Sequence, residues 1–297
     1  MKEHCAPVYL KKHKKKFAAA AVCVSAVLLL YYNDILTLSV KNSVYFCLNS
    51  IIPALFPFLL ITEIITRNGI YPKKSHLLSG LFLGIVCGFP SGAKFAHSLY
   101  RNGMVSKKKA EYINAVSNNA GISFSYGFTA SALGVNGFAV MMIQVISVLI
   151  SCIILRFATG KDDGKYISIP FGETEKAKRG GVYMTVRSAL GTMAMICAFI
   201  TVFSAISDII CSYIPNEQLP KMIIRGFFEI SGGIKEASAA ARKGLVYACS
   251  ILCWSGLCVC FQIRSVIKDD LSIKPYLLAH LIQSASAAAL AFIYLSL

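Results

Sequence analysis

Long apolar runs separated by short polar gaps dominate the sequence. The runs cover approximately residues 17–32, 41–65, 76–99, 110–133, 137–157, 183–213, 219–241, 244–266 and 275–297. Several of them approach the length of about 20 residues that a helix needs to cross a bilayer. Because lipid tolerates only a backbone that satisfies its own hydrogen bonds, the pattern predicts an all-α polytopic membrane protein.

One run carries helix-breaking residues in its middle. Within residues 76–99, the segment "GFPSG" occupies positions 88–92. Glycine and proline at such a place end or kink a helix. Lysines flank the run on both sides, so we expect a re-entrant hairpin of two short helices, with a single kinked helix as the alternative.

Three further interruptions follow, and their order indicates an internal repeat. They are "SNNAGIS" at 117–123, "EISGGIK" at 229–235 and "WSGLCVCFQ" at 254–262. A shift of 141 positions places Gly92 on Gly233 and Lys94 on Lys235. Each half also begins with a long apolar run that carries an acid near its far end, Glu63 or Asp208. The matching order of elements favours a duplication in which both halves contain a hairpin and broken helices.

The stretch at 158–182 separates the two halves. Its glycines, proline and mixed charges are typical of a water-exposed linker. We therefore expect a basic N-terminus and first span at 1–40, a first repeat at 41–157 and a second repeat at 183–297. The apolar stretch at 17–32 resembles a signal peptide, but no small-x-small cleavage site follows it, so we expect an uncleaved span.

Composition and charge agree with a membrane protein. Hydrophobic residues make up 56% of the 297 residues and charged residues only 15%, which argues against a soluble domain. The net charge is +16, but the basic residues gather in gaps such as "KKHKKK" at 11–16 and "KKK" at 107–109. Such clusters mark cytoplasmic ends and contacts with anionic lipid, and we expect no nucleic-acid partner.

The charge pattern predicts a cytoplasmic N-terminus in a multi-pass protein of the inner cell membrane. Tracing the spans from that side gives the second half the opposite orientation to the first, so the repeats are predicted to be inverted. The scheme places a few basic residues on the outside, which the positive-inside rule disfavours. These residues are Lys221, Arg225, Arg242 and Lys243.

Broken helices expose backbone groups at membrane depth, where they need protein, water or a ligand as partner. Two inverted hairpins that meet near the midplane would form a polar pocket for a small solute such as a nucleoside or a small acid. Packing of small residues, capping by the asparagines and snorkelling of Lys94 are the alternatives. The candidate solute-binding residues are Gly88, Pro90, Ser91, Gly92, Lys94, Asn118, Asn119, Gly121, Ser123, Glu229, Ser231, Gly232, Gly233, Ser255, Gly256 and Gln262.

The sequence offers no pattern for catalysis. Most of the eleven cysteines lie inside apolar runs, and the five histidines are scattered without metal-ligand spacing. The phosphate-loop pattern and arrangements of nucleophile and base are absent. We expect no enzyme activity, no cofactor and no metal site.

The four interruptions, in their order along the chain, resemble the sporulation integral membrane protein family (YlbJ-like). That family is placed in the nucleoside-recognition (Gate) superfamily, and the resemblance covers approximately residues 41–297. It differs at Ile122, where the family pattern commonly has a proline. The resemblance implies an inner-membrane protein needed for spore formation, with a core similar to part of nucleoside transporters.

Together these features predict a transporter-like protein of sporulation. Its solute would lie between the two repeats, and its surroundings are the lipid bilayer. The alternative is a non-transporting scaffold for a spore-envelope assembly complex. Contacts with a second copy or with other spore-envelope proteins are compatible with both.

Overall fold

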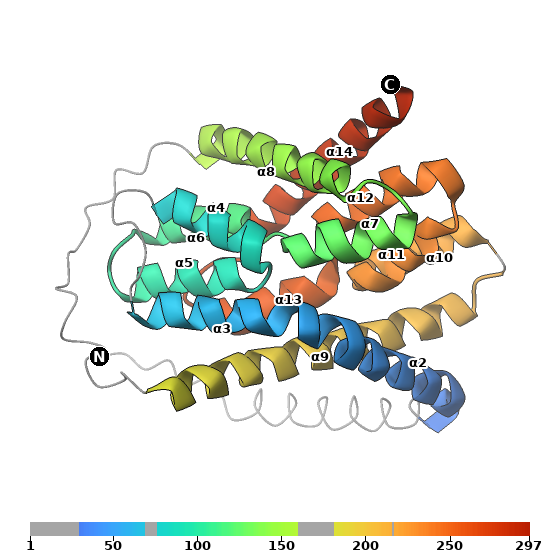
Figure 1. Ribbon diagram of the computed structural model, residues 1–297, viewed down its shortest axis with the longest axis horizontal. Coiled ribbons are helices and arrows are strands. Elements are labelled where there is room, and N and C mark those ends of the chain that lie inside the picture. Colours follow the sequence, from blue (N-terminus) through green and yellow to red (C-terminus); the bar gives the residue numbers. More distant parts are fainter. Residues whose placement is uncertain (1–29, 69–75, 160–180, 216) are drawn as a thin grey trace, which may run out of the picture.

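The computed structural model describes residues 30–68, 76–159, 181–215 and 217–297, and within these ranges every regular element is helical (Figure 1). Most of the predicted span at 17–32 lies outside the described residues, and so does nearly all of the predicted linker. The first half contains α2 (Asn33–Phe46), η1 (Cys47–Ile51), α3 (Ile52–Asn68), α4 (His76–Cys87), α5 (Ser91–Arg101), α6 (Lys107–Ser117), η2 (Ser123–Thr129), α7 (Ala130–Leu133) and α8 (Gly137–Thr159).

The second half begins with one long helix and continues with pairs of short ones. Its elements are α9 (Val182–Ser212), α10 (Gln218–Phe228), α11 (Ile230–Ser238), the short η4 (Ala241–Lys243), α12 (Gly244–Trp254), α13 (Gly256–Ile267) and α14 (Lys274–Ser296). The elements η1 and η2 are π-helical turns inside otherwise α-helical segments.

Among the described residues, five helical segments are long and apolar enough to cross a membrane. They are Asn33–Ile65, Gly137–Phe157, Val182–Ser212, Gly244–Ile267 and Lys274–Ser296. Their outward faces carry large exposed apolar side chains, among them Leu48, Phe157 and Phe292. A soluble protein rarely exposes apolar surface on this scale, so these faces contact the lipid bilayer. The chain is a multi-pass membrane protein.

Polar side chains lie on the inside of the bundle, the reverse of a soluble protein. Asn118, Gln144 and Glu229 are each at most 5% exposed, and several serines and threonines are buried with them. Polar groups within membrane-spanning segments are expensive to bury and commonly mark a functional interior. The fold therefore surrounds a polar centre with an apolar shell.

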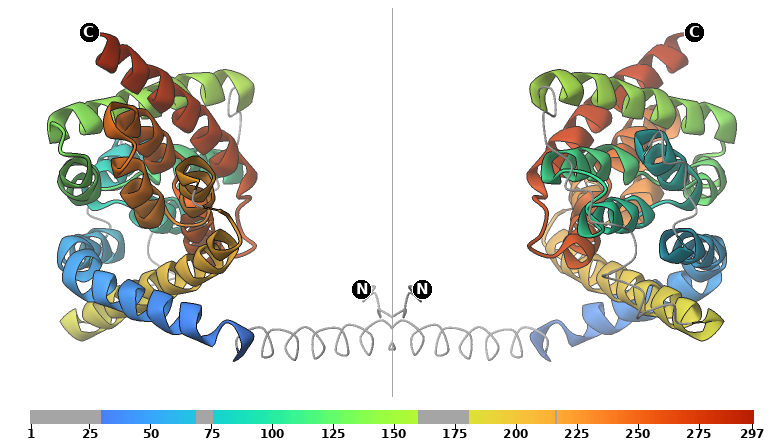
Figure 2. Two further views of the ribbon diagram at one scale, coloured as in Figure 1. Left: turned by 90° about the vertical axis from the view of Figure 1, so that its right-hand side faces the viewer. Right: turned by 90° about the vertical axis from the view of Figure 1, so that its left-hand side faces the viewer.

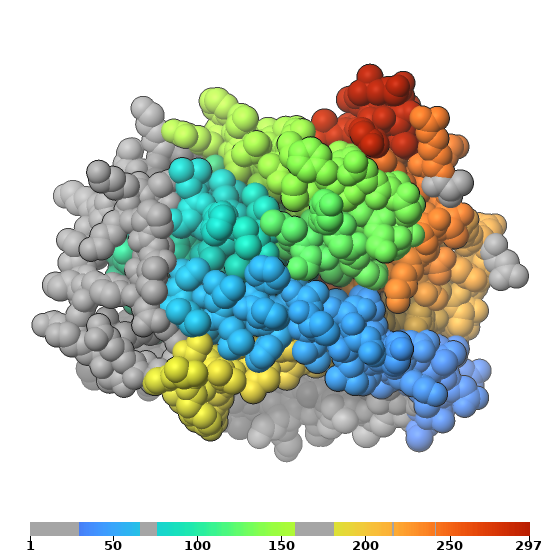
Figure 3. Space-filling model, in the orientation of Figure 1, coloured from blue at the N-terminus to red at the C-terminus, as the bar shows by residue number. Residues whose placement is uncertain are grey.

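Some helices of the two halves match in length. Helices α6 and α12 have 11 residues each, and α8 and α14 have 23 residues each. Helices α8 and α14 pack against each other, and α2 and α3 pack along α9. In Figure 2 the bundle is seen along its long axis, with α9 beside α2 and α3. Figure 3 shows residues 30–68 as a band along one face of the molecule.

The loops between short helices lie at two ends of the molecule. Residues 102–106 join α5 to α6 at the left of Figure 1, and residues 213–217 join α9 to α10 at its right. We call these the α5–α6 end and the α9–α10 end. At the α5–α6 end, His97 on α5 hydrogen-bonds Asp270 at 2.7 Å, so the first half contacts the loop between α13 and α14 there. This hydrogen bond lowers the pKa of Asp270 below its ordinary value.

All four predicted interruptions are breaks between helices, and the breaks meet in pairs. Gly88, with a positive φ of 75°, lies against Gly121, because a Cβ added to Gly88 would be 2.9 Å from the Gly121 nitrogen. A Cβ added to Gly256, whose φ is 71°, would be 3.1 Å from the oxygen of Phe228, next to the break at Glu229. A residue with a side chain fits neither place, so these glycines permit the backbone contacts.

The start of the first described helix differs from the prediction. The polar residues 33–40 suggested a gap between two apolar runs, but α2 already begins at Asn33. The expected boundary at residue 40 therefore falls inside a helix. The physical reason is that Ser39 and Ser43 are buried on the inner face of α2, where polar side chains line a cavity instead of a loop.

Candidate functional site

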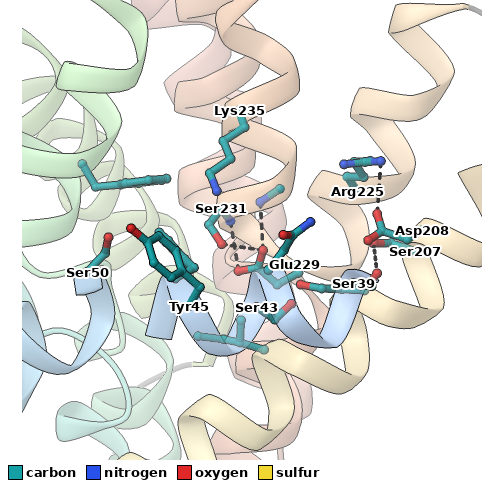
Figure 4. Close-up of a pocket in the computed structure, with 16 residues that line it drawn as sticks. Ser39, Ser43, Tyr45, Ser50, Ser207, Asp208, Arg225, Glu229, Ser231 and Lys235 are labelled. Carbon is teal, nitrogen blue, oxygen red and sulfur yellow. Dashed lines mark hydrogen bonds and ion pairs between the residues drawn. The ribbon is translucent and has the colours of Figure 1, made fainter. Parts of the chain in front are cut away.

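A cavity of about 540 Å³ lies between the two halves. Helix α2 and the two π-helical turns supply its first-half wall, and α9, α10 and α11 supply the other (Figure 4). We call it the inner cavity. It is lined by Ser39, Asn42, Ser43, Tyr45, Phe46, Ser50, Phe128, Ile200, Ser204, Ser207, Asp208, Arg225, Glu229, Ser231, Gly232 and Lys235.

Glu229 occupies the break between α10 and α11 and caps α11. Its carboxylate accepts hydrogen bonds from the backbone nitrogens of Ser231 at 3.0 Å and Gly232 at 2.8 Å, and from the Ser231 hydroxyl at 2.5 Å. The positive end of a helix dipole favours a carboxylate at this position. Glu229 is 5% exposed, so these donors compensate most of its charge within the protein.

Lys235 projects from α11 into the same cavity, as Figure 4 shows. Its amine lies 4.5 Å from the centroid of the Phe46 ring, which is within the range of a cation–π contact. Within the described part of the chain no carboxylate forms an ion pair with Lys235. The cavity therefore contains one lysine that no carboxylate of the described residues neutralises.

A second cavity of about 360 Å³ adjoins the first toward the α9–α10 end. We call it the outer cavity. Ser39, Asn42, Asp208 and Arg225 line both cavities, and Cys211, Ser212 and Lys221 line only the outer one. The cavities meet at an ion pair in which Arg225 Nη2 lies 3.1 Å from Asp208 Oδ1. Arg225 Nε also lies 3.4 Å from Glu236 Oε1 on α11.

This network bears on the predicted topology. The sequence placed Asp208 near the far end of an apolar run and Arg225 among the outside basic residues that the positive-inside rule disfavours. In the structure Arg225 lies on α10 and pairs with both Asp208 and Glu236. Because its charge is compensated, Arg225 counts little in the distribution of free positive charge.

The first half has an ion pair where the second half has the cavity. Lys94 on α5 forms an ion pair with Glu63 on α3 and donates to the hydroxyl of Thr192 on α9 at 2.6 Å. Glu63 is 5% exposed. Lys94 therefore does not snorkel to an interface. It holds α3, α5 and α9 together through these contacts.

The paired asparagines support the helix breaks in this conformation. The Asn118 side-chain oxygen accepts from the Ala93 backbone nitrogen at 2.8 Å, which caps the first turn of α5. Its amide nitrogen donates to the Asn114 backbone oxygen at 2.6 Å. Asn119 donates to the Val116 oxygen at 2.8 Å, while its own side-chain oxygen is buried without a hydrogen-bond partner. Capping, the alternative given above, describes the contacts of Asn118.

The remaining candidates divide between the cavity wall and the breaks. Of the predicted residues, Glu229, Ser231 and Gly232 line the inner cavity. Ser91 accepts a hydrogen bond from Thr62 at 3.2 Å, and Gln262 donates to the Cys258 sulfur at 3.2 Å. The others lie at or near the breaks: Gly88, Pro90 and Gly92 at the first, Asn118, Asn119, Gly121 and Ser123 at the second, Gly233 just after Glu229, and Ser255 and Gly256 at the fourth.

A residue that the sequence did not single out connects the halves at the fourth break. His280 on α14 is 1% exposed, and its Nδ1 lies 2.7 Å from the Cys253 oxygen and 3.1 Å from the Ser255 hydroxyl. Its helix, α14, packs against α6 and α8 of the first half. A lone histidine in an apolar run gave no signal for this contact, because it depends on how α14 packs.

The serine-rich wall of the inner cavity was also missed, although a signal for it exists. Ser39, Ser43 and Ser50 recur within one apolar segment, and Ser204, Ser207 and Asp208 recur within another. Spacings of three, four and seven residues place side chains on one face of a helix. Such a polar stripe in a membrane-spanning helix predicts an inward face. Lys235 was matched to Lys94 but was not included among the site residues.

The described residues contain no group of three or more His, Cys, Asp or Glu side chains that could hold a metal ion. The inner cavity instead offers hydroxyl groups, one uncompensated lysine and one capped carboxylate. These groups can bind and orient a small polar solute by hydrogen bonds and charge.

Comparison with known proteins gives one informative match. No family model matches the chain, and no solved structure matches it significantly. The sporulation integral membrane protein YlbJ of Bacillus subtilis (strain 168) is 23% identical over 295 residues, which cover 80% of this chain and 72% of that protein. This match supports the predicted resemblance to the YlbJ-like sporulation integral membrane proteins, and placement in the wider Gate superfamily stays a prediction.

Proposed function

We propose that the protein is a transporter-like inner-membrane protein of sporulation that binds a small anionic solute in the inner cavity. The observation that carries the proposal is Lys235, a lysine in a polar cavity of about 540 Å³ without a carboxylate partner in the described chain. Lys235 is exposed, so its amine is accessible to a solute that enters the cavity. A solute that brings its own carboxylate would supply a partner for this amine.

Comparison of the two halves supports this assignment. Lys94 and Lys235 lie 141 positions apart, and the same separation leads from Glu63 to Ser204. Ser204 lines the inner cavity. The first half therefore supplies a carboxylate to its lysine, and the second half has a short hydroxyl and empty volume instead. Between the two solute classes expected from the sequence, this difference favours a small acid over a nucleoside.

Inverted orientation of the halves is part of the proposal. The hairpin α4–α5 opens at the α5–α6 end and the hairpin α10–α11 opens at the α9–α10 end, with their breaks toward the middle (Figure 1). The larger number of basic residues favours the α5–α6 end as the cytoplasmic one. Those near that end are Arg101, Lys107, Lys108, Lys109, Lys268 and Lys274, whereas Lys221, Arg242 and Lys243 are near the other.

In this scheme the solute is moved without chemical change. Helices α2 and α3 pack along α9, so a small rotation of one half against the other would change which end of the inner cavity is accessible. Rocking of one repeat against the other around a central site is a common mode of transport in proteins with broken helices. The name of the relative from Bacillus subtilis supports the link to sporulation.

Uptake into liposomes tests the proposal. Liposomes with the purified protein and empty liposomes would be given labelled acetate, succinate, citrate or uridine. We expect accumulation of at least one of the acids above the empty liposomes. Accumulation of uridine alone would contradict the assignment of an anionic solute. If none of the probes accumulates while the purified protein still melts cooperatively, the scaffold role is favoured.

A further inference from the structure

The boundary between the inner and outer cavities is formed by four residues that line both of them. The inner and outer cavities share Ser39, Asn42, Asp208 and Arg225, and only the outer cavity reaches Cys211 and Ser212 at the end of α9. A solute that leaves the inner cavity toward the α9–α10 end therefore passes these shared residues. Of the four, only Asp208 and Arg225 are charged, and they are paired with each other at 3.1 Å.

Arg225 connects three helices at this point. It lies in the last turn of α10, and its guanidinium faces Asp208 on α9 and Glu236 on α11. Its side chain is 30% exposed, and those of Asp208 and Glu236 are 26% exposed. An ion pair with this exposure contributes little to stability, so it can open without disrupting the fold.

We propose that the Arg225–Asp208 ion pair is a gate between the inner and outer cavities. The outer cavity is then the entrance to the solute site from the α9–α10 end. A carboxylate that arrives there can replace Asp208 on the guanidinium, because arginine binds carboxylates through two parallel donors. Opening of the gate and first capture of the anion are thus one exchange of partners. The capture of an anion by Arg225 depends on the proposed function, whereas the gate itself does not.

Cysteine accessibility tests the gate without any solute. A cysteine at Ser204 reports on the inner cavity, and a cysteine at Ser212 reports on the outer one. The purified protein in nanodiscs would be treated with a charged methanethiosulfonate, whose sulfur forms a disulfide with the cysteine thiolate while methanesulfinate leaves. The rate is taken relative to the same chain without the introduced cysteine, because Cys211 also lines the outer cavity.

We expect Arg225→Ala to raise the modification rate at residue 204 by about fivefold, the factor that corresponds to about 1 kcal/mol of lost ion pairing. The rate at residue 212 should stay unchanged. Lys221→Ala is the matched control, since Lys221 lines only the outer cavity. The double exchange Arg225→Asp with Asp208→Arg, made together with Glu236→Gln so that no carboxylate faces the aspartate introduced at position 225, should restore the slow rate, which mere loosening of α10 would not allow.

Asp208→Asn gives a second route to the same result if Arg225→Ala fails to fold. The proposal would be overturned if the cysteine at residue 204 is modified at the same rate with the wild-type ion pair and with a folded Arg225→Ala or Asp208→Asn variant. An unchanged slow rate at 204 together with a faster rate at 212 would overturn it as well. If the cysteine test gives the expected rates but no labelled acid accumulates in liposomes, the gate is supported and the proposal of an anionic solute is contradicted.

Discussion

Replacing Glu63 with glutamine is expected to destabilise the protein by about 3–5 kcal/mol, the usual cost of leaving one member of a buried ion pair without its partner. Glu63 is 5% exposed and pairs with Lys94, which also donates to Thr192 at 2.6 Å. The variant would leave a positive charge at the contact between α3, α5 and α9. The midpoint of thermal unfolding of the protein in detergent measures the loss.

A double variant separates the charge from the shape of the site. Glu63→Gln combined with Lys94→Met removes both charges, and we expect it to recover most of the stability that the single change loses, because a neutral pair has no unpaired charge to bury. Glu217→Gln, at an exposed acid in the loop before α10, serves as a control with no expected change. Equal losses in the single and double variants would show that the ion pair is not what stabilises this contact.

Replacing Lys235 with glutamine is expected to reduce acid uptake about 10- to 100-fold, since a hydrogen bond to a charged partner contributes about 1.5–3 kcal/mol. The lysine forms no ion pair within the described chain, so its loss leaves no carboxylate unpaired. The thermal midpoint should therefore change little. Initial uptake rates at low acid concentration, compared with thermal melting of the same sample, measure both effects.

Two variants control this prediction. Lys235→Arg keeps the charge and should retain a larger share of the uptake than the glutamine variant. Lys243→Gln removes a basic residue near the same end of the molecule, outside both cavities, and should leave uptake unchanged. If Lys235→Gln transports at the wild-type rate, the inner cavity does not bind the solute through this amine.

The positions of the helix breaks were predictable because they depend on local chemistry. Gly88 and Gly256 have positive φ angles, and both lie in glycine-containing motifs recognised from the sequence. The hairpin helices α4 and α5 end and begin at the predicted interruption. A backbone with positive φ favours glycine at that position, so such a break can be recognised from a few residues of sequence.

The partners of the charged residues were not predictable, because they depend on how distant helices pack. Sequence alone did not indicate that Glu63 neutralises Lys94 across 31 positions, or that Asp208 pairs with Arg225 instead of Lys235. The same is true of Asn118, whose side chain caps α5 from the end of α6. Both Asp208 and Lys235 line the inner cavity, but among the described residues Asp208 pairs with Arg225 on α10.

A central solute site between the halves requires that the two halves have opposite orientations in the membrane. Single cysteines at Lys107, beside the α5–α6 end, and at Glu217, beside the α9–α10 end, would be labelled on intact cells with a maleimide that does not cross membranes. We predict labelling of residue 217 from outside and labelling of residue 107 only after the membrane is permeabilised. Labelling of both positions from the same side would contradict the inverted arrangement and, with it, the central solute site.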